Sequence, residues 1–222
     1  MRTLYHFTLL PACRIVRSAL GEKKLEVDLK AERIWEQSDD FLAVNPAGDV
    51  PVLIEPDGTT LTELWVITEY LDEVYPDVPL LGDDPLARAE TRRLMVWFDQ
   101  RFGREVTDNL VGEKVLRRFY RTGQPVSDRI REGKERIGFH LDYIGYLAEQ
   151  RNWLAGEDLS YADLVAAAHL SAVDYLGDIP WEKYHEAKNW YARVKSRPSF
   201  RPILDELVPG VAPARHYRDL DF

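Results

Sequence analysis

The chain has 222 residues, of which 45% are hydrophobic and 30% are charged, and its net charge is −9 at pH 7. This composition excludes a disordered or fibrous protein, and the excess of acid predicts repulsion from nucleic acid and from anionic membrane surfaces. A single cysteine, Cys13, excludes an internal disulfide and fits a reducing compartment, so we expect a cytoplasmic protein with no direct membrane insertion.

The first third of the chain alternates strand and helix patterns. Residues 3–9 form a short apolar run typical of a strand, and residues 13–20 have helical spacing. Apolar and charged residues alternate over 25–29, which predicts a half-buried strand. Residues 51–55 and 59–62 flank a Pro-Asp-Gly turn and predict a hairpin, which a helix over 63–74 follows. This order predicts an α/β domain.

A segment rich in proline and glycine separates this domain from the rest. No helical or strand periodicity runs through this segment, which contains Pro76, Pro79, Gly82 and Pro85 and is therefore interpreted as a linker. The remaining pattern predicts helices over 86–120, 126–151, 160–176 and 181–195, without strand alternation. We therefore expect an α/β domain at 1–78, a linker at 79–86, an all-α domain at 87–207 and a C-terminal tail at 208–222.

Four motifs occur in a fixed order along the chain. They are residues 45–51 (NPAGDVP), Thr62-Glu63 at a helix start, residues 153–163 (WLAGEDLSYAD) and Arg197-Pro198. Within the third motif, Ser160 and Asp163 have the spacing of a capping box. Together the motifs resemble the cytosolic glutathione S-transferase superfamily over nearly the whole chain. The resemblance implies a thioredoxin-like N-terminal domain, an all-α C-terminal domain and a cis peptide bond at Pro51.

The glutathione pocket that this resemblance implies lacks several of its functional groups. A thiol donor is expected beside Pro11, where this chain has Leu10. An acid followed by a serine is expected at the helix start, and the chain keeps Glu63 but has Leu64 next to it. Asp49 adds negative charge to a pocket for an anion. We expect a degenerate pocket, no cofactor and no transferase activity, with pocket residues Leu10, Val50, Pro51, Glu63 and Leu64.

Two alternatives keep a ligand in that pocket. A glutathione-dependent transferase or isomerase would need Thr8 or Cys13 as its donor, although a cysteine near a helix start is more often a packed residue. A second alternative is an apolar ligand, which Leu10 and Leu64 favour. The histidines are scattered without ligand spacing, so no metal site is expected, and His169 fits a core position.

Two further segments have residues that a transferase does not need. Ile34 and Trp35 lie in a very polar connection, which is typical of an interface anchor or of a tryptophan folded back over the domain edge. Residues 113–136 include eight basic and four acidic residues. Within this segment, Arg117, Arg118 and Arg121 flank two aromatic residues in the sequence. This cluster would suit an acidic partner or a solvated helix end.

The C-terminus has the composition of a recognition tail. Prolines and a glycine at 209–213 lead into Asp219, Leu220, Asp221 and Phe222. An extended tail would present these residues to a partner, whereas Tyr217, Leu220 and Phe222 could instead dock on the chain's own domain. Both interpretations stay open.

These features together resemble a bacterial cell-division branch of the superfamily whose members bind the tubulin-like protein FtsZ. The resemblance implies a homodimer without enzymatic activity that binds FtsZ filaments at midcell, promotes their bundling or curvature, and couples the division ring to constriction. We expect the filament contact at Ile34, Trp35, Arg117, Arg118 and Arg121. The tail would meet a second division or cell-wall synthesis protein.

Overall fold

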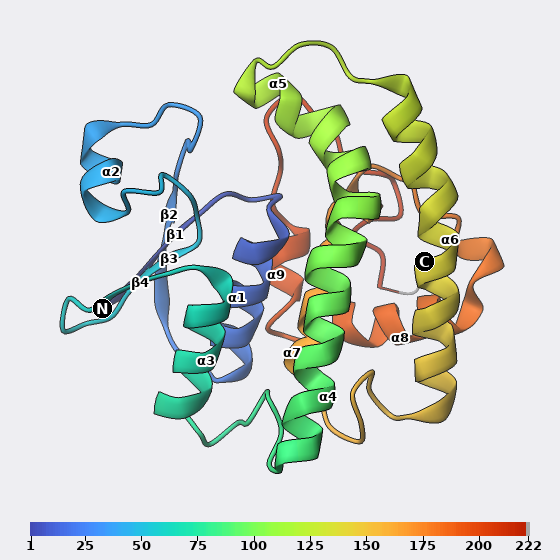
Figure 1. The fold of residues 1–222 in the computed structure, drawn as a ribbon, viewed down its shortest axis with the longest axis horizontal. Helices are drawn as coiled ribbons and strands as arrows, with labels where there is room; N and C mark the ends of the chain where they lie inside the picture. The colour runs from blue at the N-terminus through green and yellow to red at the C-terminus, as the bar shows by residue number, and fades with distance from the viewer. Residues whose placement is uncertain (221–222) are drawn as a thin grey trace.

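The computed structural model describes residues 1–220 and consists of a small α/β half joined to a larger helical half (Figure 1). The sheet contains β1 (Arg2–His6), β2 (Val27–Ala31), β3 (Val52–Ile54) and β4 (Thr60–Thr62) in the order β2-β1-β3-β4. Strands β1 and β2 are parallel, and the other two pairings are antiparallel. The expected fold class, an α/β thioredoxin-like domain followed by an all-α domain, is confirmed.

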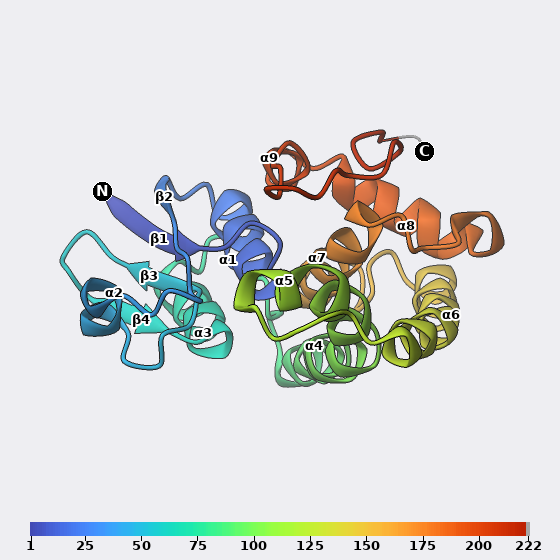
Figure 2. The same cartoon turned by 90° about the horizontal axis from the view of Figure 1, so that it is seen from above.

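The helices of the α/β half cover the sheet on both sides. Helices α1 (Pro11–Glu22) and α3 (Leu64–Val74) lie between the sheet and the helical half, and α2 (Asp39–Val44) lies on the far side (Figure 2). The sequence pattern did not predict α2, which is short and begins where the Ser38 hydroxyl accepts a hydrogen bond from the amide of Phe41. Apolar residues of β1, α1 and α3 form the core of this half.

A long helical run begins the second half. Helix α4 (Pro85–Val96), the segment η1 (Trp97–Leu116) and α5 (Arg117–Tyr120) follow one another without a break, as the periodicity over 86–120 predicts. The middle segment is wound as a π-helix, which the apolar spacing does not reveal. Helix α6 (Ser127–Gln150), α7 (Tyr161–Tyr175), the 3₁₀ turn η2 (Trp181–Lys183), α8 (His185–Lys195) and α9 (Arg201–Leu204) complete the half.

Helix α7 is the centre of the molecule. Every one of its residues is buried, and it contacts α1, α4, η1 and α8. The expected capping box is confirmed at its start, where Ser160 and Asp163 satisfy the first free amides. Asp163 is fully buried and accepts additional hydrogen bonds from the amide of Leu154 (2.9 Å) and the indole of Trp190 (2.9 Å). One carboxylate therefore ties the start of α7 to a loop and to α8.

The linker is held firmly against the α/β half. The Asp72 carboxylate accepts hydrogen bonds from the amides of Leu80 and Leu81 and pairs with Lys23 at 2.9 Å. Across the boundary, the fully buried Arg14 of α1 donates to the Ser171 hydroxyl of α7 at 2.6 Å. The two halves are thus joined by buried polar contacts in addition to apolar packing.

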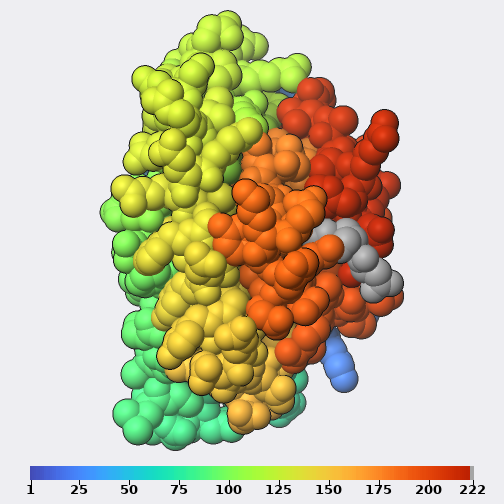
Figure 3. Space-filling model, turned by 90° about the vertical axis from the view of Figure 1, so that its right-hand side faces the viewer, coloured from blue at the N-terminus to red at the C-terminus, as the bar shows by residue number. Residues whose placement is uncertain are grey.

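The described part of the C-terminal segment packs on its own domain instead of extending from it. Tyr217 is fully buried, and the Tyr175 hydroxyl bonds to the backbone of Val208 and Val211. The Lys195 ammonium donates to the carbonyl of Asp219. Figure 3 shows this segment, in red, lying against the orange residues that include α8. Of the two interpretations left open, docking on the chain's own domain is the one seen up to residue 220, while Asp221 and Phe222 lie outside the described residues.

Within residues 1–220, no helix combines the length and the apolar content that crossing a lipid bilayer requires.

Candidate functional site

A cleft forms where the two halves meet near the start of α1. It has a volume of about 270 Å³ and is lined by the Val50–Pro51 peptide, Glu63, Leu64 and residues of α1, α3 and η1. The peptide bond before Pro51 is cis, as the resemblance implies. Leu10 lines an adjoining cavity of about 310 Å³ that shares Ala12, Val50 and Asp99 with the first. All five residues of the expected degenerate pocket therefore lie around this pair of adjoining cavities.

The first cavity is acidic. Asp49, Glu63 and Asp99 line it, and no lysine, arginine or histidine of the described residues does so. Glutathione has two carboxylates and one ammonium group, so Glu63, the acid expected in such a pocket, suits the ammonium, whereas Asp49 and Asp99 would repel the carboxylates. Asp99 comes from η1 in the helical half and escaped the sequence analysis, because no motif marks it. The structure thus adds a third carboxylate to the two that the sequence indicated.

The two α1-end residues nearest the expected thiol position, Leu10 and Cys13, are unsuited to activating a thiol. Leu10 stands at the N-cap of α1, and its side chain makes no capping hydrogen bond. Cys13 is fully buried in the core, and its sulfur accepts a hydrogen bond from the amide of Phe7. Burial raises the pKa of this thiol to about 12. The interpretation of Cys13 as a packed residue is confirmed, and its use as a catalytic thiolate is wrong.

Cys13 should be unreactive toward a thiol reagent in the native protein. Because the thiol is buried and protonated near neutral pH, we expect labelling by Ellman's reagent to be at least ~100-fold slower than in concentrated urea. Absorbance of the released thiolate measures the rate, and Cys13→Ser is the blank. Labelling of the native chain at the unfolded rate would show that α1 opens readily.

His169 is buried at the wall of the second cavity. Its Nδ1 lies 2.8 Å from the hydroxyl of Thr107, and its Nε2 lies 3.5 Å from a carboxylate oxygen of Asp99. It packs against the ring of Phe102, as a core histidine does. Asp108 lines the same cavity, and burial raises the pKa of its carboxyl group. The second cavity is thus bordered by polar groups as well as by Leu10 and Val111.

A second candidate site is an aromatic cluster at the boundary between the two halves. Trp35 is half-buried, stacks on Phe119 with ring centroids 4.8 Å apart, and meets the edge of Phe7. Trp35 belongs to the α/β half and Phe119 to α5, so the two segments that the sequence singled out separately lie side by side. The tryptophan does fold over the domain edge, and part of its surface stays accessible. We call Trp35, Phe119, Tyr120, Arg118 and Arg121 the boundary patch.

The other predicted contact residues differ in accessibility. Ile34 is only 4% exposed, so its side chain belongs to the core. The expectation that Ile34 contacts the filament is therefore corrected. Arg117 turns toward Glu113 and the carbonyl of Thr122. Arg118 donates to the carbonyl of Gly210 at 3.0 Å, which fastens the C-terminal segment to α5. Arg121 is exposed and makes no ion pair within residues 1–220.

Two family models match the chain. One describes the N-terminal domain of glutathione S-transferases and matches residues 11–74, and the other describes their C-terminal domain and matches residues 111–202. Among curated proteins, FtsZ-localized protein A of Caulobacter vibrioides is 49% identical over 100% of this chain and 98% of its own length.

Solved structures are similar over the whole chain. A glutathione S-transferase from Rhodospirillum rubrum is 55% identical with a TM-score of 0.98, and the match covers 100% of both chains. The structure of FzlA from C. crescentus is 49% identical with a TM-score of 0.96, covering 100% of this chain and 99% of the other. A structure named as a glutathione S-transferase and the structure of FzlA therefore both share this fold closely.

Proposed function

The chain belongs to the glutathione S-transferase superfamily, and from that premise we propose that it is a non-enzymatic division protein that binds FtsZ filaments. The observation that carries the proposal is the 49% identity over the whole chain with FtsZ-localized protein A. The acidic cleft supports it, because Asp49 and Asp99 add negative charge that disfavours the carboxylates of a transferase's glutathione. The protein would act at midcell, in the cytoplasm, and couple the division ring to constriction.

The boundary patch is the proposed filament contact. Trp35 offers a large ring held flat by Phe119, and a preordered aromatic residue loses little conformational freedom on binding. Arg121 adds a positive charge that no described acid neutralises, which suits an acidic filament surface. Arg118 is exposed within this patch and also donates to the carbonyl of Gly210, and Arg117 beside it donates to the carbonyl of Thr122.

A homodimer would give the protein two such patches. Exposed apolar residues on α4 and α6 lie close to η1 and form a candidate dimer face. Val96, Phe139 and Tyr146 are 43%, 50% and 59% exposed, and Arg101 lies over the rings of Trp97 and Phe139. Two patches related by symmetry would bridge neighbouring filaments and favour bundling or curvature. Asp219, Leu220, Asp221 and Phe222 are the proposed contact for a further division or cell-wall synthesis protein.

A second candidate function is a glutathione-dependent transferase or isomerase. The name of the Rhodospirillum rubrum structure, 55% identical to this chain, favours it. With Cys13 excluded, Thr8 would have to supply the donor. Thr8 is half-exposed, and its carbonyl accepts a hydrogen bond from Arg14.

Co-sedimentation with FtsZ polymers, beside chromatography on immobilised glutathione, separates the two functions. We expect the purified chain to pellet with polymer, to stay in solution with unpolymerised FtsZ, and to pass through the glutathione resin. Retention on the resin with specific elution by free glutathione, together with no pelleting, would contradict the proposal and favour the transferase.

A further inference from the structure

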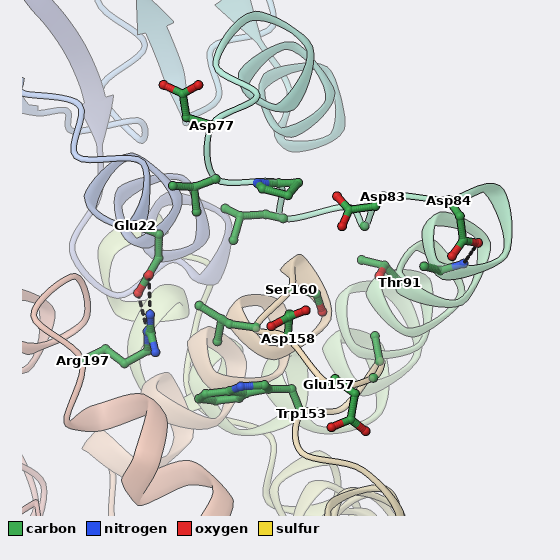
Figure 4. A pocket seen from close by; sticks show the side chains of 18 residues that line it. Glu22, Asp77, Asp83, Asp84, Thr91, Trp153, Glu157, Asp158, Ser160 and Arg197 are labelled. Atoms are coloured by element: carbon green, nitrogen blue, oxygen red, sulfur yellow. Dashed lines mark hydrogen bonds and ion pairs between the residues drawn. The ribbon is translucent and has the colours of Figure 1, made fainter.

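The segment that follows α8 is fastened to the α/β half by two ion pairs. Arg197 donates to both carboxylate oxygens of Glu22, the last residue of α1 (Figure 4). Further along the segment, Glu206 pairs with Arg17 of α1 at 2.6 Å. The chain then rises from α9 toward α5, in red in Figure 1. This segment is therefore held against α1 before it reaches the boundary patch.

Residues 208–211 (VPGV) form a tight turn at this point. The amide of Val211 donates to the carbonyl of Val208 at 3.1 Å, and Gly210 has a φ of +74°. Proline followed by a glycine of positive φ is typical of a type II turn. The Tyr175 hydroxyl, at the end of α7, donates to the carbonyl of Val211 at 2.7 Å and accepts from the amide of Val208 at 3.0 Å. Because Tyr175 is fully buried, the turn is fixed to the central helix.

The turn presents a backbone carbonyl to α5. Nη1 of Arg118 donates to the carbonyl of Gly210 at 3.0 Å. A Cβ atom at Gly210 would lie 2.6 Å from Nη1 and 2.7 Å from Nη2 of Arg118, so only glycine allows this approach. The atoms in the way are the far end of a flexible side chain. A larger residue at this position would therefore displace the guanidinium more readily than it would disrupt the fold.

Arg118 lies next to the aromatic stack of the boundary patch. It is exposed and directly precedes Phe119, whose ring stacks on Trp35. A guanidinium has several N–H groups, and within residues 1–220 Arg118 makes a hydrogen bond only to Gly210. Its other N–H groups are thus available to a carboxylate of a partner. A charged side chain that is already held in place loses less conformational freedom on binding than a free one does.

We propose that the turn at 208–211 is a positioning element of the filament contact, whose Gly210 carbonyl holds the Arg118 guanidinium ready for an acidic group of the filament. This inference rests on the proposed FtsZ binding. Gly210 and Tyr175 are then positioning residues, which act through Arg118 without having to touch the filament. The C-terminal segment thereby contributes to filament binding, in addition to any role at a further partner.

The first arm of the test examines the geometry without FtsZ. In the full chain labelled with ¹⁵N-arginine, NMR relaxation measures the mobility of the Arg118 Nε–H group, which Arg118→Lys identifies. We expect a rigid group in the parent and a mobile one in Gly210→Ala. The matched control is Gly58→Ala in the β3–β4 turn, where φ is +91° and an added Cβ would meet no atom within 4 Å. It imposes backbone strain of the same kind and should leave Arg118 rigid.

The second arm is co-sedimentation with FtsZ polymer, after thermal unfolding has established that each variant is folded. Gly210→Ala should weaken binding at least ~3-fold, Arg118→Ala at least as much, and Gly58→Ala less than ~2-fold. The double variant Gly210→Ala/Arg118→Ala should bind as Arg118→Ala does, because both changes remove the same contact. A turn that served only the stability of the fold would give additive losses.

The outcomes separate this proposal from the proposed function. A mobile Arg118 in the parent, parent-like binding by Gly210→Ala, or additive losses in the double variant would overturn the positioning role while FtsZ binding stands. A folded parent that does not pellet with polymer would overturn the proposed function, and this proposal with it.

Discussion

Trp35→Ala should reduce the affinity for FtsZ polymer at least ~10-fold. A tryptophan at the centre of a contact commonly contributes ~2 kcal/mol or more to binding, and here the ring is also preordered by its stack on Phe119. The change removes the accessible aromatic surface of Trp35 and leaves the Phe119 ring in contact with Phe7 alone among its aromatic neighbours in the described chain. Co-sedimentation over a range of polymer concentrations measures the loss.

Two further variants make this result specific. Leu86→Ala removes a side chain that is 82% exposed and distant in sequence from the patch, and it should leave binding unchanged. Phe119→Ala should weaken binding in the same direction as Trp35→Ala, with a smaller effect, since it loosens the tryptophan without deleting it. Circular dichroism and thermal unfolding establish that each variant is folded. Normal binding by a folded Trp35→Ala protein would place the filament contact elsewhere.

Asp163→Ala should lower the free energy of unfolding by about 3–5 kcal/mol, the size typical of breaking a buried charged network. The carboxylate is fully buried and accepts hydrogen bonds from the amides of Leu154 and Ser160 and from the indole of Trp190. Alanine leaves these donors unsatisfied and removes a cap from the central helix. Urea unfolding followed by circular dichroism measures the change.

Asp57→Ala is a suitable comparison for this prediction. Asp57 also accepts a hydrogen bond from a backbone amide, that of Thr59, but it lies exposed in the β3–β4 turn. Its loss should change the free energy of unfolding far less than the loss of Asp163, because water replaces the exposed hydrogen bond. Asp163→Asn keeps one acceptor oxygen and should fall between the two. If Asp163→Ala destabilises the protein no more than Asp57→Ala does, the buried network is not important for stability.

The features that were predicted correctly depend on residues that lie close together in the sequence. The hairpin, the capping box at Ser160 and Asp163, and the helical run after residue 86 are all visible as local spacing. Helix α2 was missed because its six residues are too few to show a period. The π-helical winding of η1 was missed because apolar spacing does not distinguish it.

The sites were harder to predict because they join distant segments. No local pattern brings Asp99 to Asp49, or Phe119 to Trp35, since each pair connects the two halves of the chain. Ile34 was predicted as a contact from its polar neighbours, but in the fold it turns inward beside Trp35. The C-terminal segment has the composition of a free tail, yet Tyr217 finds a buried position against Tyr175.

The two edge strands of the sheet affect whether neighbouring copies of this protein aggregate at high local concentration. Strand β2 has only five residues and exposes Asp28 and Lys30, and β4 has only three, two of them threonines. Short, charged or polar edges are poor templates for adding a strand from another molecule. Many copies aligned along a polymer would therefore stay separate molecules and resist the edge-to-edge pairing that begins β-aggregation.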